Sequence, residues 1–324
     1  MTMLEWKATV LVSAVGIDLL FGEPHNRFHP VAWMGSIIGN LQRFGSSSNW
    51  LASLMWGLAI TVAGSVVLMF LGIVVEFAAP PRVREHDVSL LLVLGLLLNA
   101  SMLKSCVGIR SLWNASNSVR DALSVGDLPE ARRCLAYHLV SRDVRNLGES
   151  EISAATIESV AENTSDSVIA PVFFYLVAGM PGALVYRYIN TCDAMLGYRT
   201  PSLEWLGKVP ARTDDLLNLI PARITAALML LPSLPKRHRF SRALGIWWAD
   251  SGKTESPNAG HPMSVAAGLI GIRLEKEGHY VLGERLRSPC HEDIATMNSL
   301  FQCTVLLAVS FVLVLCLVGE GLNP

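Results

Sequence analysis

The segment ESVAENTSDS, residues 158–167, places three carboxylates in front of an uncharged stretch. Glu158, Glu162 and Asp166 follow at four-residue spacing, so in an α-helix they share one face and drift by about 40°. Like charges at this spacing repel one another, and we expect a cation to compensate them. Carboxylates suit Mg²⁺, which is commonly held by one or two of them with substrate phosphates. The alternative is a solvated acidic helix face followed by an N-cap.

A second polar set lies in YRYINTCDAMLGYR, residues 186–199, where Asn190 and Asp193 repeat the Asn-Thr-x-Asp order that begins at Asn163. The two sets flank one apolar stretch, and they could converge on a shared polyanion or metal. Amide and carboxylate groups of this kind are expected to contact substrate. The alternative is that they serve as helix caps, because Asn, Thr and Asp are all good cap residues.

An arginine interrupts the apolar part of ARTDDLLNLIPARITA, residues 211–226. An ionisable residue at membrane depth is a functional hypothesis by default. Arg223 could grip a carboxylate or phosphate through two parallel hydrogen bonds. The structural alternative is an ion pair with Asp18 or Asp215.

Two further motifs carry weaker signals. In SPNAGHPMSVAAG, residues 256–268, Ser256, Asn258 and the amides of a following helix could hold a phosphate, although a tight loop without ligand is equally common. In FGEPHNRFHP, residues 21–30, Glu23 and His29 could act as a base or a ligand, and the alternative for His29 is a hydrogen-bonding surface residue. No Walker A sequence, nucleophile elbow or HExxH motif is present.

The elements that position these residues are those of a membrane protein. Of the 324 residues, 51% are hydrophobic and 16% are charged, whereas soluble domains carry about 25% charge. A bilayer crossing needs roughly 17 to 25 apolar residues. The predicted spans are Leu4–Phe21, Leu51–Val75, Val88–Leu103 and Ile294–Gly319.

Two other apolar stretches, 168–186 and 216–234, contain Pro, Gly or Arg and are predicted to be broken or re-entrant. If neither crosses fully, only Lys7, Arg82 and Arg84 lie on one side, and the motif loops share the positive, cytoplasmic side with the other basic residues. If both cross, the charge division is more even. We favour the first topology, because broken helices are tolerated where they line a cavity.

The fold class expected is therefore all-α, with about four full transmembrane helices, two broken or re-entrant segments and cytoplasmic amphipathic helices. Residues 1–324 are predicted to form a single membrane-embedded catalytic unit with polar insertions at about 104–165 and 236–293. The six cysteines include no CxxC pair, which argues against structural zinc. Net charge is −1 without a basic block, so nucleic acid is not expected as a partner.

Taken in order, these motifs resemble the CobD/CbiB family of cobalamin biosynthesis, the adenosylcobinamide-phosphate synthases. The similarity includes GDLPEARRCLAYHLVSRDV and the central residues 154–198, and it covers nearly the whole chain. The sequence departs from the family pattern at His261 after SPNAG and at SGKTE before it.

The resemblance implies a multi-pass inner-membrane enzyme whose motif loops face the cytoplasm. It would join adenosylcobyric acid, a corrinoid, to (R)-1-amino-2-propanol O-phosphate or to aminopropanol through an amide bond. ATP is implied as cosubstrate and Mg²⁺ as cofactor. Membrane lipid and other cobalamin-assembly membrane enzymes are the expected partners.

On this basis Glu158, Glu162 and Asp166 are hypothesised to hold Mg²⁺-phosphate, with Glu162 and Asp166 essential for catalysis. Glu23 or His29 is the hypothesised base. The other hypothesised substrate contacts are Asn163, Asn190, Asp193, Arg223, Lys253, Ser256 and Asn258. Two alternatives stay open at this point: a transporter or binding protein for an anionic solute, and a non-catalytic relative of the family.

Overall fold

The computed structural model describes residues 2–45, 49–78 and 90–321, and these residues are mostly helical. They divide into two compact units, each built from separate stretches of the chain. Unit 1 contains Met1–Gly108, Ala170–Leu217 and Phe311–Pro324, and unit 2 contains Ile109–Ile169 and Asn218–Ser310. The sequence predicts one unit with two polar insertions, and those insertions lie almost wholly in unit 2.

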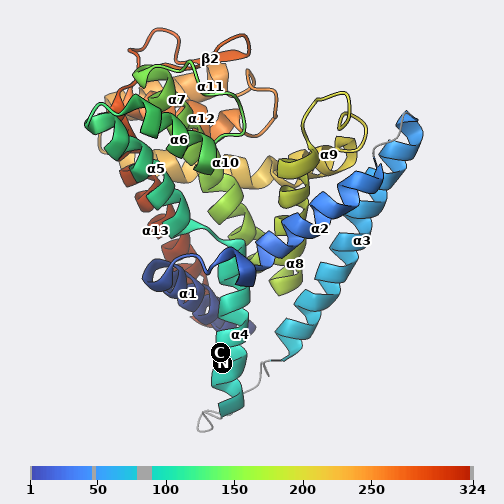
Figure 1. The fold of residues 1–324 in the computed structure, drawn as a ribbon. Coiled ribbons are helices and arrows are strands. Elements are labelled where there is room, and N and C mark those ends of the chain that lie inside the picture. The colour runs from blue at the N-terminus through green and yellow to red at the C-terminus, as the bar shows by residue number, and fades with distance from the viewer. Residues whose placement is uncertain (1, 46–48, 79–89, 322–324) are drawn as a thin grey trace. The chain divides into compact units, whose positions relative to one another are not determined.

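The secondary-structure elements in the described part of unit 1 are all helices. Its elements are α1 (Met3–Phe21), η1 (Asn26–Phe28), α2 (Pro30–Gly45), α3 (Trp50–Phe77), α4 (Leu90–Cys106), α8 (Ala170–Leu196) and α9 (Lys208–Leu217). The long helices α3 and α8 pack side by side, as Figure 1 shows. Tyr188 fixes this contact, because its hydroxyl donates to the Ile60 carbonyl at 2.9 Å.

Unit 2 contains shorter helices and one small hairpin. Its elements are α5 (Ile109–Ser124), α6 (Leu128–His138), α7 (Glu149–Thr164), η2 (Ser165–Ile169), α10 (Leu219–Leu230), η3 (Leu231–Ser233), α11 (Arg237–Asp250), α12 (Gly260–Ile270), β1 (Leu274–Lys276), β2 (Tyr280–Leu282) and most of α13 (His291–Gly321). The helical prediction is therefore confirmed apart from the two three-residue strands.

Four helical stretches are long and apolar enough to cross a membrane: Trp50–Phe77, Leu90–Ser124, Glu149–Leu196 and His291–Leu315. Three of them contain or overlap predicted spans, although the first two residues of the span predicted at 88–103 lie outside the described residues, as do Arg82 and Arg84. The predicted first span forms α1, but three charged residues, Glu5, Lys7 and Asp18, keep it out of this set. The fourth stretch of the set is Glu149–Leu196, which contains the apolar residues 168–186.

The interruption predicted within 168–186 is present in α8. The helix loses helical geometry at Gly179, whose φ is 67°, shortly before Pro181. A side chain at position 179 would collide with the Glu76 carboxylate, so both the backbone and the space require glycine. Close to the kink, the Lys7 ammonium donates to the Leu176 carbonyl at 2.9 Å.

The second predicted interruption, within 216–234, is also present. The helix stops at Leu217 and restarts at Leu219, with Asn218 between them. The two helices together have the composition of a broken span or a re-entrant loop.

Candidate functional site

The three carboxylates of the acidic segment lie on consecutive helical turns in unit 2. Glu158 and Glu162 belong to α7, whereas Asp166 lies in η2, a five-residue π-helix. Glu158 is only 6% exposed, and the other two are half-buried. The π-helix has a wider turn than the α-helix, so it rotates Asp166 away from the position that uniform α-helical spacing predicts.

Glu158 is surrounded by groups that sequence reasoning missed. Its carboxylate lies 3.8 Å from the Arg142 guanidinium, and the Tyr280 phenol hydrogen-bonds to it. Lys276 is also within electrostatic range. Among the described residues, the buried Oε1 atom of Glu158 has no hydrogen-bond partner. A buried acceptor without a partner is costly, so this oxygen is a candidate ligand atom.

The charges of Glu158 and Glu162 also affect the Tyr280 phenol. Burial raises the pKa of Tyr280 most, and the two carboxylates raise it further. Tyr280 therefore stays protonated and can donate a hydrogen bond at any physiological pH. The only sequence signal for this contact is the alternation in LEKEGHYVL, residues 274–282, with glycine at the turn.

Carboxylates alone do not complete a metal site here. Within residues 2–45, 49–78 and 90–321, no group of three or more His, Cys, Asp or Glu side chains is arranged to hold a metal ion. Glu158 and Glu162 still offer two hard oxygen ligands side by side, which is the number Mg²⁺ commonly takes when phosphates complete its coordination.

Asn163 is engaged within its own helix. Its side-chain amide donates to the Ser159 carbonyl at 2.9 Å, and its side-chain oxygen accepts from Ser167 at 3.1 Å. The second bond spans the junction between α7 and η2. The amide therefore braces the π-helix that carries Asp166.

The second Asn-Thr-x-Asp set lies in unit 1, on α8. The Asn190 side-chain amide donates to Asp214 of α9 at 3.3 Å. Asp193 lies beside Asp215, which also belongs to α9. Neither residue caps a helix, because α8 continues to Leu196. The helix-cap alternative is thus wrong for this set. The first set, which begins at Asn163, belongs to unit 2.

Arg223 lies on an exposed face of α10 in unit 2. Its guanidinium donates to the Leu219 carbonyl at 2.6 Å. It also acts on His261 of α12, since burial and then the Arg223 charge lower the pKa of that imidazole. Trp247 donates to Nδ1 of His261 at 2.8 Å, which further favours the neutral ring. The proposed ion-pair partners, Asp18 and Asp215, both belong to unit 1.

The loop before α12 is closed by its own hydrogen bonds. Lys253 pairs with Asp250 at 2.6 Å. The Ser256 hydroxyl accepts from the Asn258 amide at 3.3 Å, and Thr254 bonds to the Ser256 carbonyl at 2.7 Å. Asn258 is 5% exposed. This bonding is typical of a tight loop, and it engages Lys253, the Ser256 hydroxyl and the backbone N–H of Asn258.

Glu23 and His29 form a direct contact in unit 1. Nε2 of His29 lies 2.6 Å from Glu23, and the buried Lys104 lies 2.5 Å from the same carboxylate oxygen. Burial by itself raises the pKa of Glu23, but the hydrogen bonds from His29 and Lys104 outweigh it and lower the pKa from its usual value. Lys104 also pairs with Asp18 at 3.4 Å. Sequence reasoning found the first two residues and missed Lys104.

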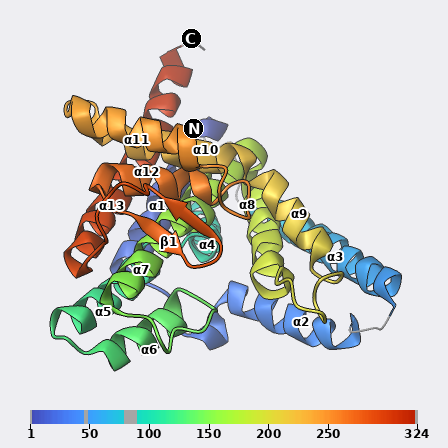
Figure 2. The same ribbon diagram turned by 90° about the horizontal axis from the view of Figure 1, so that it is seen from above.

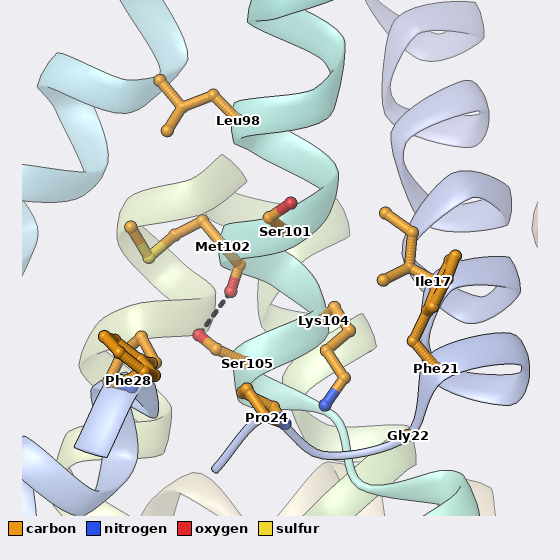
Figure 3. A pocket seen from close by; sticks show the side chains of 11 residues that line it. Ile17, Phe21, Gly22, Pro24, Phe28, Leu98, Ser101, Met102, Lys104 and Ser105 are labelled. Carbon is orange, nitrogen blue, oxygen red and sulfur yellow. Dashed lines mark hydrogen bonds between the residues drawn. The ribbon is translucent and has the colours of Figure 1, made fainter. Parts of the chain in front are cut away.

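A cavity of about 350 Å³ adjoins this cluster and is shown in Figure 3. Lys104 and two serines supply its polar groups, and the rest of the wall is mostly apolar. Its apolar lining includes Ile17, Phe21, Phe28, Leu98 and Met102. The volume is at the low end of the range for small-molecule sites.

Comparison with known proteins gives consistent matches over most of the chain. A family model described as CobD/Cbib protein matches residues 11–306. Cobalamin biosynthesis protein CobD of Dehalococcoides mccartyi is 37% identical, covering 86% of this chain and 87% of that relative. The protein of the same name from Geobacter metallireducens is 40% identical, covering 82% and 80%. The probable cobalamin biosynthesis protein CobD of Methanothermobacter thermautotrophicus is 36% identical, covering 93% and 95%. No solved structure matches.

Proposed function

This chain belongs to the CobD/Cbib family of cobalamin biosynthesis proteins, and we propose that it is an ATP-dependent amide-forming enzyme. Its proposed substrates are adenosylcobyric acid and (R)-1-amino-2-propanol O-phosphate, or aminopropanol itself. The product would be adenosylcobinamide phosphate, or adenosylcobinamide with the unphosphorylated amine. Because its relatives are named for biosynthesis, this proposal is preferred to a transporter of anionic solutes.

The chemistry requires activation of a carboxylate. A corrinoid propionate does not react with an amine until one of its oxygens becomes a leaving group. ATP can transfer its terminal phosphoryl group to that oxygen, with ADP as the leaving group. The amine then attacks the acyl carbon, inorganic phosphate departs, and a base takes the proton that the nitrogen loses.

The observation that carries this proposal is the buried Glu158 carboxylate, whose Oε1 atom lacks a partner among the described residues. A buried carboxylate with one oxygen available, next to Glu162 on the same helix, fits a cation. We propose that Glu158 and Glu162 would hold Mg²⁺ together with phosphate oxygens, and that Asp166, on the following turn, would add negative charge near the ion. When bound, the ion would neutralise charge on the transferring phosphoryl group.

For the base we propose the pair formed by His29 and Glu23. The carboxylate is ionised at neutral pH because its pKa is lowered, and it orients the imidazole through the 2.6 Å contact. Nδ1 of His29 accepts from the Val31 backbone N–H at 3.1 Å, so it would have to exchange this bond to accept a proton from the amine nucleophile. The adjoining cavity of about 350 Å³ could admit aminopropanol but is too small for a whole corrinoid.

The remaining predicted contacts keep narrower roles. Arg223 is exposed and could reach a substrate carboxylate or phosphate. Lys253, Ser256 and Asn258 would first have to exchange bonds within their loop. Asn190 and Asp193 keep their proposed role as substrate contacts on α8.

We also propose that the enzyme is multi-pass in the inner membrane with its motif loops in the cytoplasm, where ATP is available. Four stretches with the length and composition of membrane spans support this location.

One assay tests the function. Detergent-purified protein is supplied with adenosylcobyric acid, aminopropanol phosphate, ATP and Mg²⁺, and the corrinoid product is followed by mass spectrometry. We expect one amide product for each ATP consumed, and no product when ATP is omitted. Absence of the amide, together with ATP-independent solute uptake into liposomes, would favour the transporter instead.

A further inference from the structure

The hairpin β1–β2 presents two polar side chains on one face. Its antiparallel register pairs Lys276 directly with Tyr280, and directly opposed residues project to the same side of a sheet. Gly278, with φ of 74°, forms the turn between them. Glu275 and Val281 pair next along the ladder and project to the opposite face.

The Lys276–Tyr280 face is turned toward α7. Strand β1 packs against that helix, as Figure 2 shows, and Tyr280 hydrogen-bonds to Glu158. The Lys276 charge also acts on Glu158. From the loop that precedes α7, the Arg142 guanidinium approaches the same carboxylate at 3.8 Å. Residues far apart in the chain thus surround one buried acid.

The polar groups of this cluster are incompletely satisfied. A separation of 3.8 Å is an ion pair without a hydrogen bond, and Arg142 is 32% exposed. Among the described residues neither its guanidinium nor the Lys276 ammonium donates a hydrogen bond. Facing them, Oε1 of Glu158 accepts none. Donors and an acceptor are therefore available in the same place.

The charges of the cluster select the ligand. The acids Glu158 and Glu162 face the bases Arg142 and Lys276, so the cluster holds as many acidic as basic groups. A bare anion gains little from a neutral cluster and is repelled by the buried carboxylate. A phosphate that carries a divalent cation complements both halves, because the metal faces the acids and the phosphate oxygens face the cations.

We propose that Arg142, Lys276 and Tyr280 bind the phosphate groups of the nucleotide whose Mg²⁺ is held by Glu158 and Glu162. The hairpin is then part of the nucleotide site. This inference rests on the proposed function and assigns phosphate-binding residues to it. Lys276 supplies a point charge, Arg142 supplies a planar fork of donors, and Tyr280 supplies a hydroxyl that remains protonated.

The test measures nucleotide binding, independently of turnover. A non-hydrolysable ATP analogue with Mg²⁺ is titrated against the detergent-purified full-length protein by equilibrium dialysis. We expect Lys276→Met and Arg142→Met each to weaken binding about tenfold or more, and Tyr280→Phe to weaken it less, because it removes one uncharged donor. Aminopropanol phosphate binding should not change in any of the three.

Two control variants separate this role from nonspecific charge loss. Arg285→Met removes an exposed cation from the same segment, and Glu275→Gln alters the opposite face of the hairpin. Both should bind the analogue like wild type. Thermal unfolding of every variant is recorded, and Tyr280→Phe retains the aromatic ring, so at least one test variant keeps the packing intact.

The outcomes distinguish the two levels of the proposal. If wild type binds the analogue and the three test variants bind it equally well, the hairpin assignment is wrong and the proposed reaction stands. The assignment also fails if these variants lose aminopropanol phosphate binding instead. If wild type makes the amide but neither binds nor needs a nucleotide, the proposed use of ATP is wrong.

Discussion

Lys104 and Glu23, 81 residues apart in the chain, form an ion pair of 2.5 Å inside unit 1. The lysine side chain is 5% exposed and also contacts Asp18, which is fully buried. One ammonium group therefore compensates two carboxylates, and it keeps Glu23 in place for its contact with His29.

Lys104→Met should destabilise the protein strongly. Removing one partner of a buried ion pair leaves uncompensated charge and costs about 3 to 5 kcal/mol. The measurement is thermal or denaturant unfolding in detergent. Lys236→Met, at an exposed position, is the control and should change stability little. Equal free energies of unfolding for the two variants would show that Lys104 does not stabilise the folded protein through Glu23 and Asp18.

Glu162→Gln and Asp166→Asn should abolish turnover while the folded protein remains in the membrane. Both side chains are half-buried, so loss of charge removes cation binding with little effect on packing. EDTA should give the same loss in wild type, and added Mg²⁺ should restore activity. Glu284→Gln, at an exposed position, serves as control. Retention of most activity in the Glu162 variant contradicts its proposed role as a metal ligand.

His29→Gln and Glu23→Gln test the proposed base. General-base catalysis contributes about 10²- to 10⁴-fold, so kcat should fall by a factor in this range with KM for the amine nearly unchanged. His25→Gln is a matched control, because His25 is an exposed histidine in the same loop. A normal kcat in the His29 variant would assign proton transfer to another group.

Stability should decrease on acidification through His261. Burial and the Arg223 charge lower its folded-state pKa below the unfolded value of about 6.5. Between these two pKa values the unfolded chain binds more protons than the folded chain. The stability that the neutral imidazole contributes is therefore complete above about pH 6.5 and is lost as pH falls through the folded-state pKa. Arg223→Met should reduce the fall in Tm between about pH 7 and pH 5. An unchanged pH dependence would rule out this coupling.

Gly179→Ala should destabilise the kink in α8. A non-glycine residue at positive φ costs about 1 to 3 kcal/mol, and the added methyl group would meet the Glu76 carboxylate. The matched control is Gly16→Ala in α1, where a Cβ has no neighbour within 4 Å and helix propensity favours alanine. We expect opposite changes in Tm, and a Gly179 variant as stable as wild type would contradict the strain argument.

Local features of this protein could be predicted from the sequence because they depend on neighbouring residues. The lengths of uncharged runs indicated α3, α4 and α13, and Pro181 and Gly179 indicated the break in α8. The first predicted span forms the helix α1, and its three charged residues make it less apolar than the other candidates. Glu23 and His29 are six residues apart, and a short turn brings them together.

The surroundings of each site were decided by tertiary packing. Arg142, Lys276 and Tyr280 reach Glu158 from a loop and a hairpin, and Lys104 reaches Glu23 from another helix. No spacing rule links such residues, because their contacts depend on which helix faces meet. The sequence alone determined the apolar helices, their breaks and the acidic segment. Only the folded chain determined that Glu158 is buried among cations with one oxygen available, because burial and counter-charges come from distant segments.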